Sequence, residues 1–249
     1  MDDWSLLSEV NVLAKLPEQF NEWLESKKWT ERRDALQALV NEMAKTPRLD
    51  SKVLAKDANI NVCALAAKCI TGLANGLQTK FAQFATLYIP VIFERFKEKK
   101  SILRDPLIEC IDAIVLTVNL DMLVDDLSDC FNKPNPQIKL QACNFIYRVM
   151  KNHSQTSAPK KTIKALAPIL VKFTADPDSE VREAACIGLG SIMRLTGDKV
   201  MNTFLGNLQE DKIKMKKICD SRDQATIEYN EEAKRKQESV SCGSVVLPG

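Results

Sequence analysis

The chain has a single histidine, His153, and only eight glycines among its 249 residues. It contains no glycine-rich phosphate loop and no nucleophile elbow, two local signatures of nucleotide-dependent and hydrolytic enzymes. Asp125, Asp126 and Asp129 do cluster, but carboxylates on one helical surface usually form a solvated face. These absences predict a protein that is not an enzyme and that needs no cofactor.

Long apolar runs and a dominant charge are also missing. No segment approaches 18 consecutive apolar residues, so the sequence predicts no membrane span, and its first residues lack the features of a signal peptide. The 35 basic and 33 acidic residues leave a net charge of +2, which is too balanced for a dedicated nucleic-acid binder. We therefore expect neither a membrane nor a nucleic acid as partner.

Paired cysteines are absent too. The eight cysteines form no Cys-x-x-Cys pair, and one histidine cannot complete a clustered ligand set, so we expect no metal site. Their even spread along the chain predicts reduced thiols packed in a core. The cysteines expected on buried helix faces are Cys69, Cys110, Cys143 and Cys186.

A repeated pattern fills most of the chain. Every 30 to 43 residues an apolar helix runs into a short polar turn, and a second helix starts with an apolar-basic pair. A period near 40 built from two helices predicts an all-α, HEAT-type solenoid, a flat paddle of about six helix pairs. The equivalent positions in the five aligned copies are Arg32, Val62, Leu103, Ile138 and Val181. The predicted repeats are 17–45, 49–76, 80–118, 120–151, 158–196 and 198–236, within one domain of residues 1–237 followed by a tail at 238–249.

Two prolines support this alignment. Pro90 precedes Leu103 by thirteen residues, and Pro168 precedes Val181 by the same number. Because proline inside a helix costs about 3 kcal/mol, its recurrence at one repeat position indicates a shared kink or helix start.

Several helix boundaries follow from capping and breaker residues. Thr30 is the expected cap of a helix at 31–45, Asn75-Gly76 is an expected helix end, and the helix near residue 101 starts at Ser101 or at Asp105. The other expected helices lie at 4–13, 17–27, 50–56 and 80–97.

The first turn carries the most distinctive side chain. Trp29 is flanked by Lys27, Lys28, Arg32 and Arg33. If the turn is exposed, a large apolar group stands in a basic setting, and Trp and Arg are the residues most enriched at binding hot spots. Alternatively, Trp29 folds back onto its own repeat as a core residue. The sequence leaves both readings open.

Basic residues recur at the same place in four of the five turns. They are Lys27, Lys28, Arg32 and Arg33 at the first turn, Lys97, Lys99, Lys100 and Arg104 at the third, Lys133 and Lys139 at the fourth, and Arg182 after the fifth. The second turn contributes Lys56 and the uncharged Asn59 and Ile60, and acidic residues offset Arg182 at the fifth. A single charge run is usually a solvated face, but this recurrence favours a basic binding edge.

These turns resemble those of TOG domains from the microtubule polymerases that carry TOG arrays, the family that includes mini spindles; CLASP-type proteins carry related domains. The resemblance covers residues 5–236 and is most specific at 28–36 and 179–182, with further similarity at Lys100 and 132–139. It implies that the turn edge binds the curved αβ-tubulin heterodimer. The implied contact residues are Trp29, Lys28, Arg32, Asn59, Lys99, Lys100, Lys133, Lys139 and Arg182.

The resemblance also implies roles and a location. The neighbourhood of Trp29 would contact one tubulin subunit and Arg182 the other, with Lys100 and Lys133 or Lys139 between them. The domain would be monomeric within a chain of several TOG domains, at microtubule plus ends, spindle and centrosome in the cytoplasm. Two rival hypotheses are a HEAT adaptor that binds a peptide in its inter-helix groove, and a nucleic-acid-binding solenoid.

Overall fold

A computed structural model describes residues 15–43 and 59–242. Within these residues the chain is helical and contains no strand, which confirms the predicted all-α repeat fold. The expected helices at 4–13 and 50–56 lie outside the described residues. The chain divides into two compact units, Met1–Cys130 and Phe131–Gly249, each of which is described by itself.

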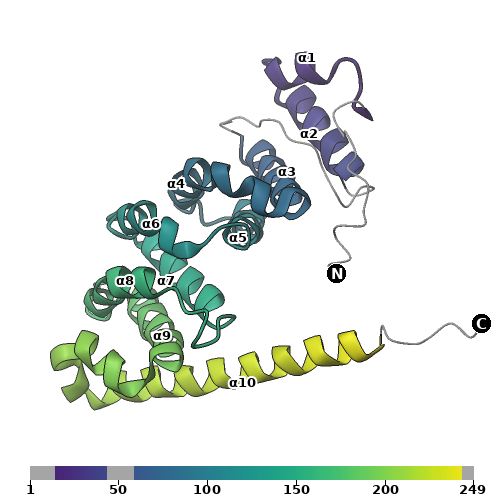
Figure 1. The fold of residues 1–249 in the computed structure, drawn as a ribbon. Coiled ribbons are helices and arrows are strands. Elements are labelled where there is room, and N and C mark those ends of the chain that lie inside the picture. Colours follow the sequence, from purple (N-terminus) through teal and green to yellow (C-terminus); the bar gives the residue numbers. More distant parts are fainter. Residues whose placement is uncertain (1–14, 44–58, 243–249) are drawn as a thin grey trace, which may run out of the picture. The chain divides into compact units, whose positions relative to one another are not determined.

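Among the described residues, the first unit contains the second helices of the first three repeats and the first helices of the first and third repeats (Figure 1). Its second helices, α2, α3 and α5, pack on one another in chain order. The elements are α1 (Phe20–Glu25), α2 (Trp29–Met43), α3 (Ile60–Leu77), the 3-10 helix η3 (Gln78–Phe84), α4 (Ala85–Arg95), α5 (Ser101–Val115), the 3-10 helix η4 (Leu120–Met122) and most of α6 (Val124–Phe131).

The second unit begins at Phe131, the last residue of α6, and its helix α9 packs against α7, α8 and α10. Its elements are α7 (Pro136–Met150), α8 (Lys160–Phe173), α9 (Ser179–Leu205), the 3-10 helix η5 (Gly206–Glu210) and α10 (Lys212–Cys242). At Gly197, with φ 75° and ψ 164°, α9 kinks into the first helix of the sixth repeat. Helix α10 continues to Cys242, past the tail boundary expected at residue 238.

Backbone hydrogen bonds give the five second helices a common register. In each one, the amide of the fourth residue donates to the carbonyl of the residue before the helix, the first bond of the α-helical ladder. The five bonded pairs are Arg32–Lys28, Cys63–Asn59, Arg104–Lys100, Lys139–Asn135 and Arg182–Asp178. Position four is therefore basic in four of the five repeats.

This register corrects two sequence predictions about the first repeat. Helix α2 begins at Trp29, so Thr30 is not its cap, and the residue equivalent to Val62 is Glu31 and not Arg32. The error arose because Lys28 precedes the helix, and its ammonium side chain, unlike a hydroxyl or carboxylate, cannot accept a hydrogen bond from the helix amides. Ser26 and Glu31 order this turn instead, through a hydrogen bond of 2.6 Å.

Two other boundaries are settled by the structure. Helix α5 begins at Ser101, with Pro106 inside the helix. Helix α3 passes through Gly76 and ends at Leu77, and Gln78 takes the left-handed conformation with φ 50°. The predicted stop at Asn75-Gly76 is therefore one residue early: the buried Gly76 lies within the helix, and a non-glycine residue makes the turn.

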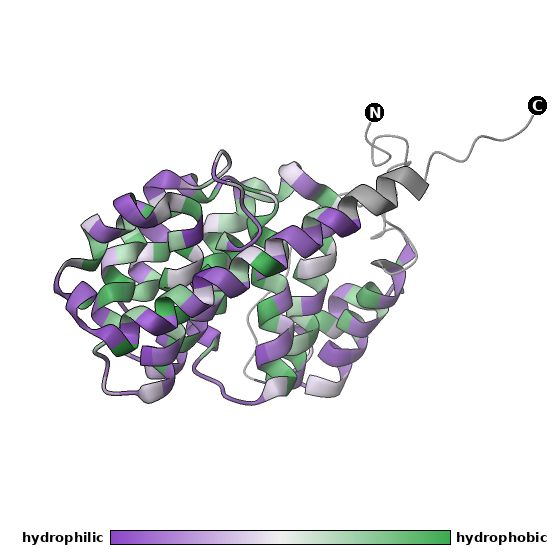
Figure 2. Cartoon of the chain, turned by 90° about the horizontal axis from the view of Figure 1, so that it is seen from below, coloured by the Kyte–Doolittle hydropathy of each residue, from purple (hydrophilic) through white to green (hydrophobic). Residues whose placement is uncertain are grey.

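The core lies where helices face one another. In Figure 2 the hydrophobic residues gather on these facing sides, while α10 is largely hydrophilic along its described length. Pro90 and Pro168 both lie inside first helices, α4 and α8. The predicted burial of the core cysteines is confirmed for Cys69, Cys110, Cys143 and Cys186.

One stretch, Ile60–Arg95, is long and apolar enough to cross a membrane by length and composition. It comprises α3, η3 and α4, and 56% of its most apolar window is buried in the protein. Cys69, Ala74 and Ile89 are fully buried there. Packing in the helical core accounts for the apolar character of this stretch.

Candidate partner-binding turns

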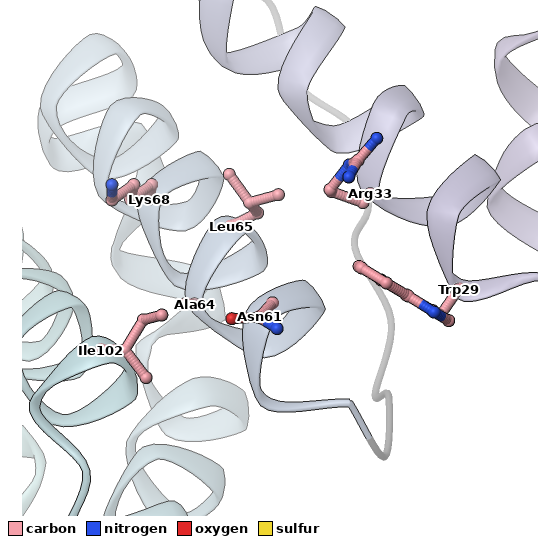
Figure 3. A pocket seen from close by; sticks show the side chains of 7 residues that line it. All are labelled: Trp29, Arg33, Asn61, Ala64, Leu65, Lys68 and Ile102. Atoms are coloured by element: carbon pink, nitrogen blue, oxygen red, sulfur yellow. The ribbon is translucent and has the colours of Figure 1, made fainter.

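The first unit brings three helix starts together. Trp29, Asn61 and Ile102, from the first turns of α2, α3 and α5, line one shallow groove (Figure 3). The three turns before these helices therefore lie on one side of the unit. We call residues 28–29, 59–61 and 99–102 the first turn row.

The surroundings of Trp29 show whether it is an exposed residue or a core residue, the two alternatives that the sequence leaves open. Its side chain is 41% exposed, and the guanidinium of Arg33 lies 5.5 Å from the ring centroid. A cation over an indole is attracted by the ring quadrupole, and this attraction orients the ring without burying it. Trp29 is thus an exposed residue on the turn row, and the core reading is wrong.

The first turn is held by its own side chains. Arg32 donates from Nη1 to the carbonyl of Ser26 at 2.7 Å, and Lys28 pairs with Glu31 at 2.9 Å. The hydrogen bond from Ser26, followed by that from Lys28, lowers the pKa of Glu31, and Glu31 in turn raises the pKa of Lys28. Arg32 therefore serves the turn structurally, while the Lys28 side chain is 76% exposed.

The second turn brings a helix cap to the first turn row, and the third turn brings exposed lysines. Asn59 caps α3, accepting a hydrogen bond from the amide of Asn61 at 2.9 Å. At the third turn Lys99 and Lys100 are exposed, while Lys97 pairs with Glu94 and Arg104 pairs with Asp105. The two exposed lysines are thus the cations that this turn offers most directly to a partner.

The second unit joins the fourth and fifth turns into a second turn row, residues 132–135 and 174–178. Lys139 Nζ lies 2.6 Å from Asp176 Oδ2, and the two side chains are 21% and 8% exposed. The ammonium also lies 5.4 Å from the Phe173 ring centroid. Lys139, predicted as a partner contact, therefore forms an ion pair that links two neighbouring repeats.

Arg182 repeats the geometry of Arg32. Its Nη1 donates to the carbonyls of Asp176 and Pro177, each at 2.8 Å, and Asp176 lies six residues earlier, as Ser26 does from Arg32. This role was not predicted from the sequence, although both arginines stand at the same distance from their turns. Position four is a turn-closing position in both repeats.

The acidic residues of the fifth turn also have internal partners. Asp178 caps α9 through the amides of Glu180 and Val181, at 2.8 and 3.4 Å. Burial raises the pKa of Asp176, but the hydrogen bonds from Lys139 and the Asp178 amide outweigh it, so the pKa is lowered overall. These carboxylates therefore oppose Arg182 less than the sequence suggested. Lys133, on the fourth turn, is half-buried.

The paired helices and their ordered turns define a HEAT-type repeat domain whose turns are suited to holding a partner. The chain belongs to the family described as CLASP N terminal, whose model matches residues 33–211. The TOG resemblance is confirmed by the relatives and solved structures that share this fold.

Two relatives cover most of this chain. Zygote defective protein 9 of Caenorhabditis elegans is 49% identical over 230 residues, which are 87% of this chain and 16% of that protein. Protein mini spindles of Drosophila melanogaster is 33% identical over 248 residues, 95% of this chain and 12% of that protein. The chain thus spans less than a fifth of the length of these two relatives.

Two solved structures share the fold. One, from work on microtubule plus end tracking by XMAP215, CLIP-170 and EB1, has a TM-score of 0.81, 33% identity, and coverage of 90% of this chain and 96% of that one. Another, from work on tubulin recruitment and assembly by microtubule polymerases with TOG domain arrays, has a TM-score of 0.77 and 22% identity. It covers 90% of this chain and 49% of that one.

Proposed function

We propose that this chain is a tubulin-binding module that captures the αβ-tubulin heterodimer through its two turn rows. It acts as part of a longer, cytoskeletal protein that promotes microtubule growth at plus ends, spindle and centrosome, and it binds without catalysing a reaction. The observation that carries the proposal is the exposed Trp29 on a row that also displays Lys28, Lys99 and Lys100. The family and the work on its solved relatives support tubulin as the partner.

The physical argument rests on how the row is composed. A large aromatic side chain supplies contact area that a partner can desolvate, and it loses little conformational entropy because Arg33 already orients it. The exposed lysines attract an acidic partner such as tubulin and accelerate its encounter. In a chain that carries several TOG domains, each further domain would raise the effective concentration of tubulin near the others and would add no reaction of its own.

The test is a titration of labelled tubulin against the chain and its Trp29→Glu variant. We expect a loss of at least 2 kcal/mol, or about thirtyfold in affinity, because a hot-spot side chain is replaced by one with the wrong charge. The free energy of unfolding should stay within about 0.5 kcal/mol of the wild-type value, since Trp29 is a surface residue.

The matched control is Leu116→Glu. Leu116 is 79% exposed and lies at the C-terminal end of α5, the end opposite the first turn row. This variant introduces the same charge at an exposed apolar residue, and tubulin binding should not change. Equal losses from the two variants, or no binding by the wild type, would refute the proposed function.

The charges are tested by Lys99→Ala combined with Lys100→Ala. We expect weaker binding at low salt and a smaller effect as salt rises, since the exposed charges are screened. Arg182→Ala is a poorer test, because it also removes the two hydrogen bonds that close the fifth turn. A salt-independent loss from the lysine variant would contradict the electrostatic part of the proposal.

A further inference from the structure

A groove leads from the first turn row onto the face formed by the second helices. It has a volume of about 370 Å³ and is lined by residues of α2, α3 and α5 (Figure 3). Trp29 and Arg33 form one side, α3 lies across the middle, and Ile102 lies on the other side. The groove was not predicted from the sequence, since its residues come from three separate repeats.

The groove has an apolar middle, formed by two side chains of α3. The small, buried side chain of Ala64 and the half-buried Leu65 lie between Trp29 and Ile102, which are 41% and 54% exposed. Lys68 lies eight residues after the start of α3, which places it about 12 Å along the helix from its first residue. A segment lying in the groove would reach well beyond the turns.

Both charged side chains that line the groove are cationic. Arg33 comes from α2 and Lys68 from α3, and no carboxylate is among the lining residues. The Arg33 guanidinium contacts the neighbouring Asp34 and the Trp29 ring, which fixes its position. Lys68 is exposed. A complementary ligand would combine one apolar side chain with flanking carboxylates.

We propose that this groove takes an acidic segment of the bound tubulin. One apolar side chain of that segment sits between Trp29 and Ile102, and its carboxylates face Arg33 and Lys68. The inference rests on the proposed function and adds Leu65 and Lys68, which belong to no turn, as residues that set partner specificity. The chain's own last residues, Ser-Val-Val-Leu-Pro-Gly, are a poorer match because they carry no acidic side chain.

The experiment compares Lys68→Glu with Lys164→Glu. Lys164 is an exposed lysine on α8 and lies outside both turn rows, so the two variants make the same charge change at different places. Tubulin affinity should fall about tenfold for Lys68→Glu at low salt, with a smaller loss at high salt, and by less than about twofold for Lys164→Glu. Leu65→Gln should also weaken binding, without the salt dependence.

The outcomes separate this inference from the proposed function. If Trp29→Glu abolishes binding while Lys68→Glu matches Lys164→Glu, the turn rows bind tubulin and the groove inference is overturned. If the wild type does not bind tubulin, the proposed function itself fails. If Lys68→Glu destabilises the free chain and Lys164→Glu does not, a segment of the chain itself occupies the groove, which also overturns the inference.

Discussion

The pair formed by Lys139 and Asp176 should contribute measurably to stability, unlike the exposed ion pairs of this protein. Lys139 comes from the first turn of α7 and Asp176 from the turn before α9, so their contact at 2.6 Å fastens one repeat to the next. We predict that Lys139→Ala lowers the free energy of unfolding by about 2 kcal/mol.

The magnitude follows from the surroundings of the two groups. A hydrogen bond to a charged group contributes about 1.5–3 kcal/mol when it is shielded from water, and Asp176 is 8% exposed. Lys139 is 21% exposed, so part of its hydration survives and a value in the lower half of that range applies. Asp176→Ala should cost more, about 3 kcal/mol, because it also removes the bond of 3.0 Å to the Asp178 amide.

Urea unfolding of the two variants measures both effects, with Lys97→Ala as the control. Lys97 and its partner Glu94 are 52% and 44% exposed, and such a pair contributes little. Equal shifts for Lys139→Ala and Lys97→Ala would refute the reasoning.

Acid should remove the contribution of Asp176. Its pKa is lowered in the folded protein, so this carboxylate stabilises the fold at pH values above its ordinary pKa of 3.8. That stabilisation is lost as the pH falls from about 4 through the folded-state pKa. The stability difference between the wild type and Asp176→Asn should therefore shrink as the pH falls below about 4, and a difference that stays constant through the acid range would contradict the assignment.

Three further predictions concern packing, acid stability and thiol reactivity. Gly190→Ala should destabilise the protein by about 3 kcal/mol in urea unfolding, because the added Cβ would lie 2.6 Å from the carbonyl oxygen of Ile218. Burial raises the pKa of Glu228, but hydrogen bonds led by that from Lys151 lower it overall. Glu228→Gln should therefore destabilise the chain at pH 7, and this effect should diminish as the pH falls from about 4.5 through the lowered folded-state pKa. Burial raises the pKa of the Cys69 thiol to about 12, so a thiol reagent should modify it far more slowly in the folded chain than after unfolding.

Much of this fold could be predicted because it depends on patterns that recur. The two-helix period, the buried faces and the burial of Cys69 all follow from side chains spaced to meet a neighbouring helix. Caps such as Asn135 and Asp178 also follow from local chemistry, because each accepts hydrogen bonds from the first turn of the helix that it precedes.

What escaped prediction depends on particular contacts. Lys28 precedes α2 where a hydroxyl or carboxylate was expected, and Ser26 with Glu31 orders that turn from further away. Gln78 adopts a conformation that glycine normally takes, although Gly76 lies two residues earlier. The pairing of Lys139 with Asp176, 37 residues apart, could not be inferred from either residue alone.

Basic residues therefore have two different roles at these turns. A cation at position four of a second helix can turn back and donate to the carbonyls before the helix, as Arg32 and Arg182 do. A cation immediately before the helix cannot make that bond, and Lys28 and Lys100 are accordingly exposed. Because closing a turn and contacting a partner both select for positive charge, a basic turn in a helical repeat does not by itself indicate a binding edge. Trp29 distinguishes the two cases here, since an exposed indole contributes nothing to closing its own turn and gains its full value only when a partner covers it.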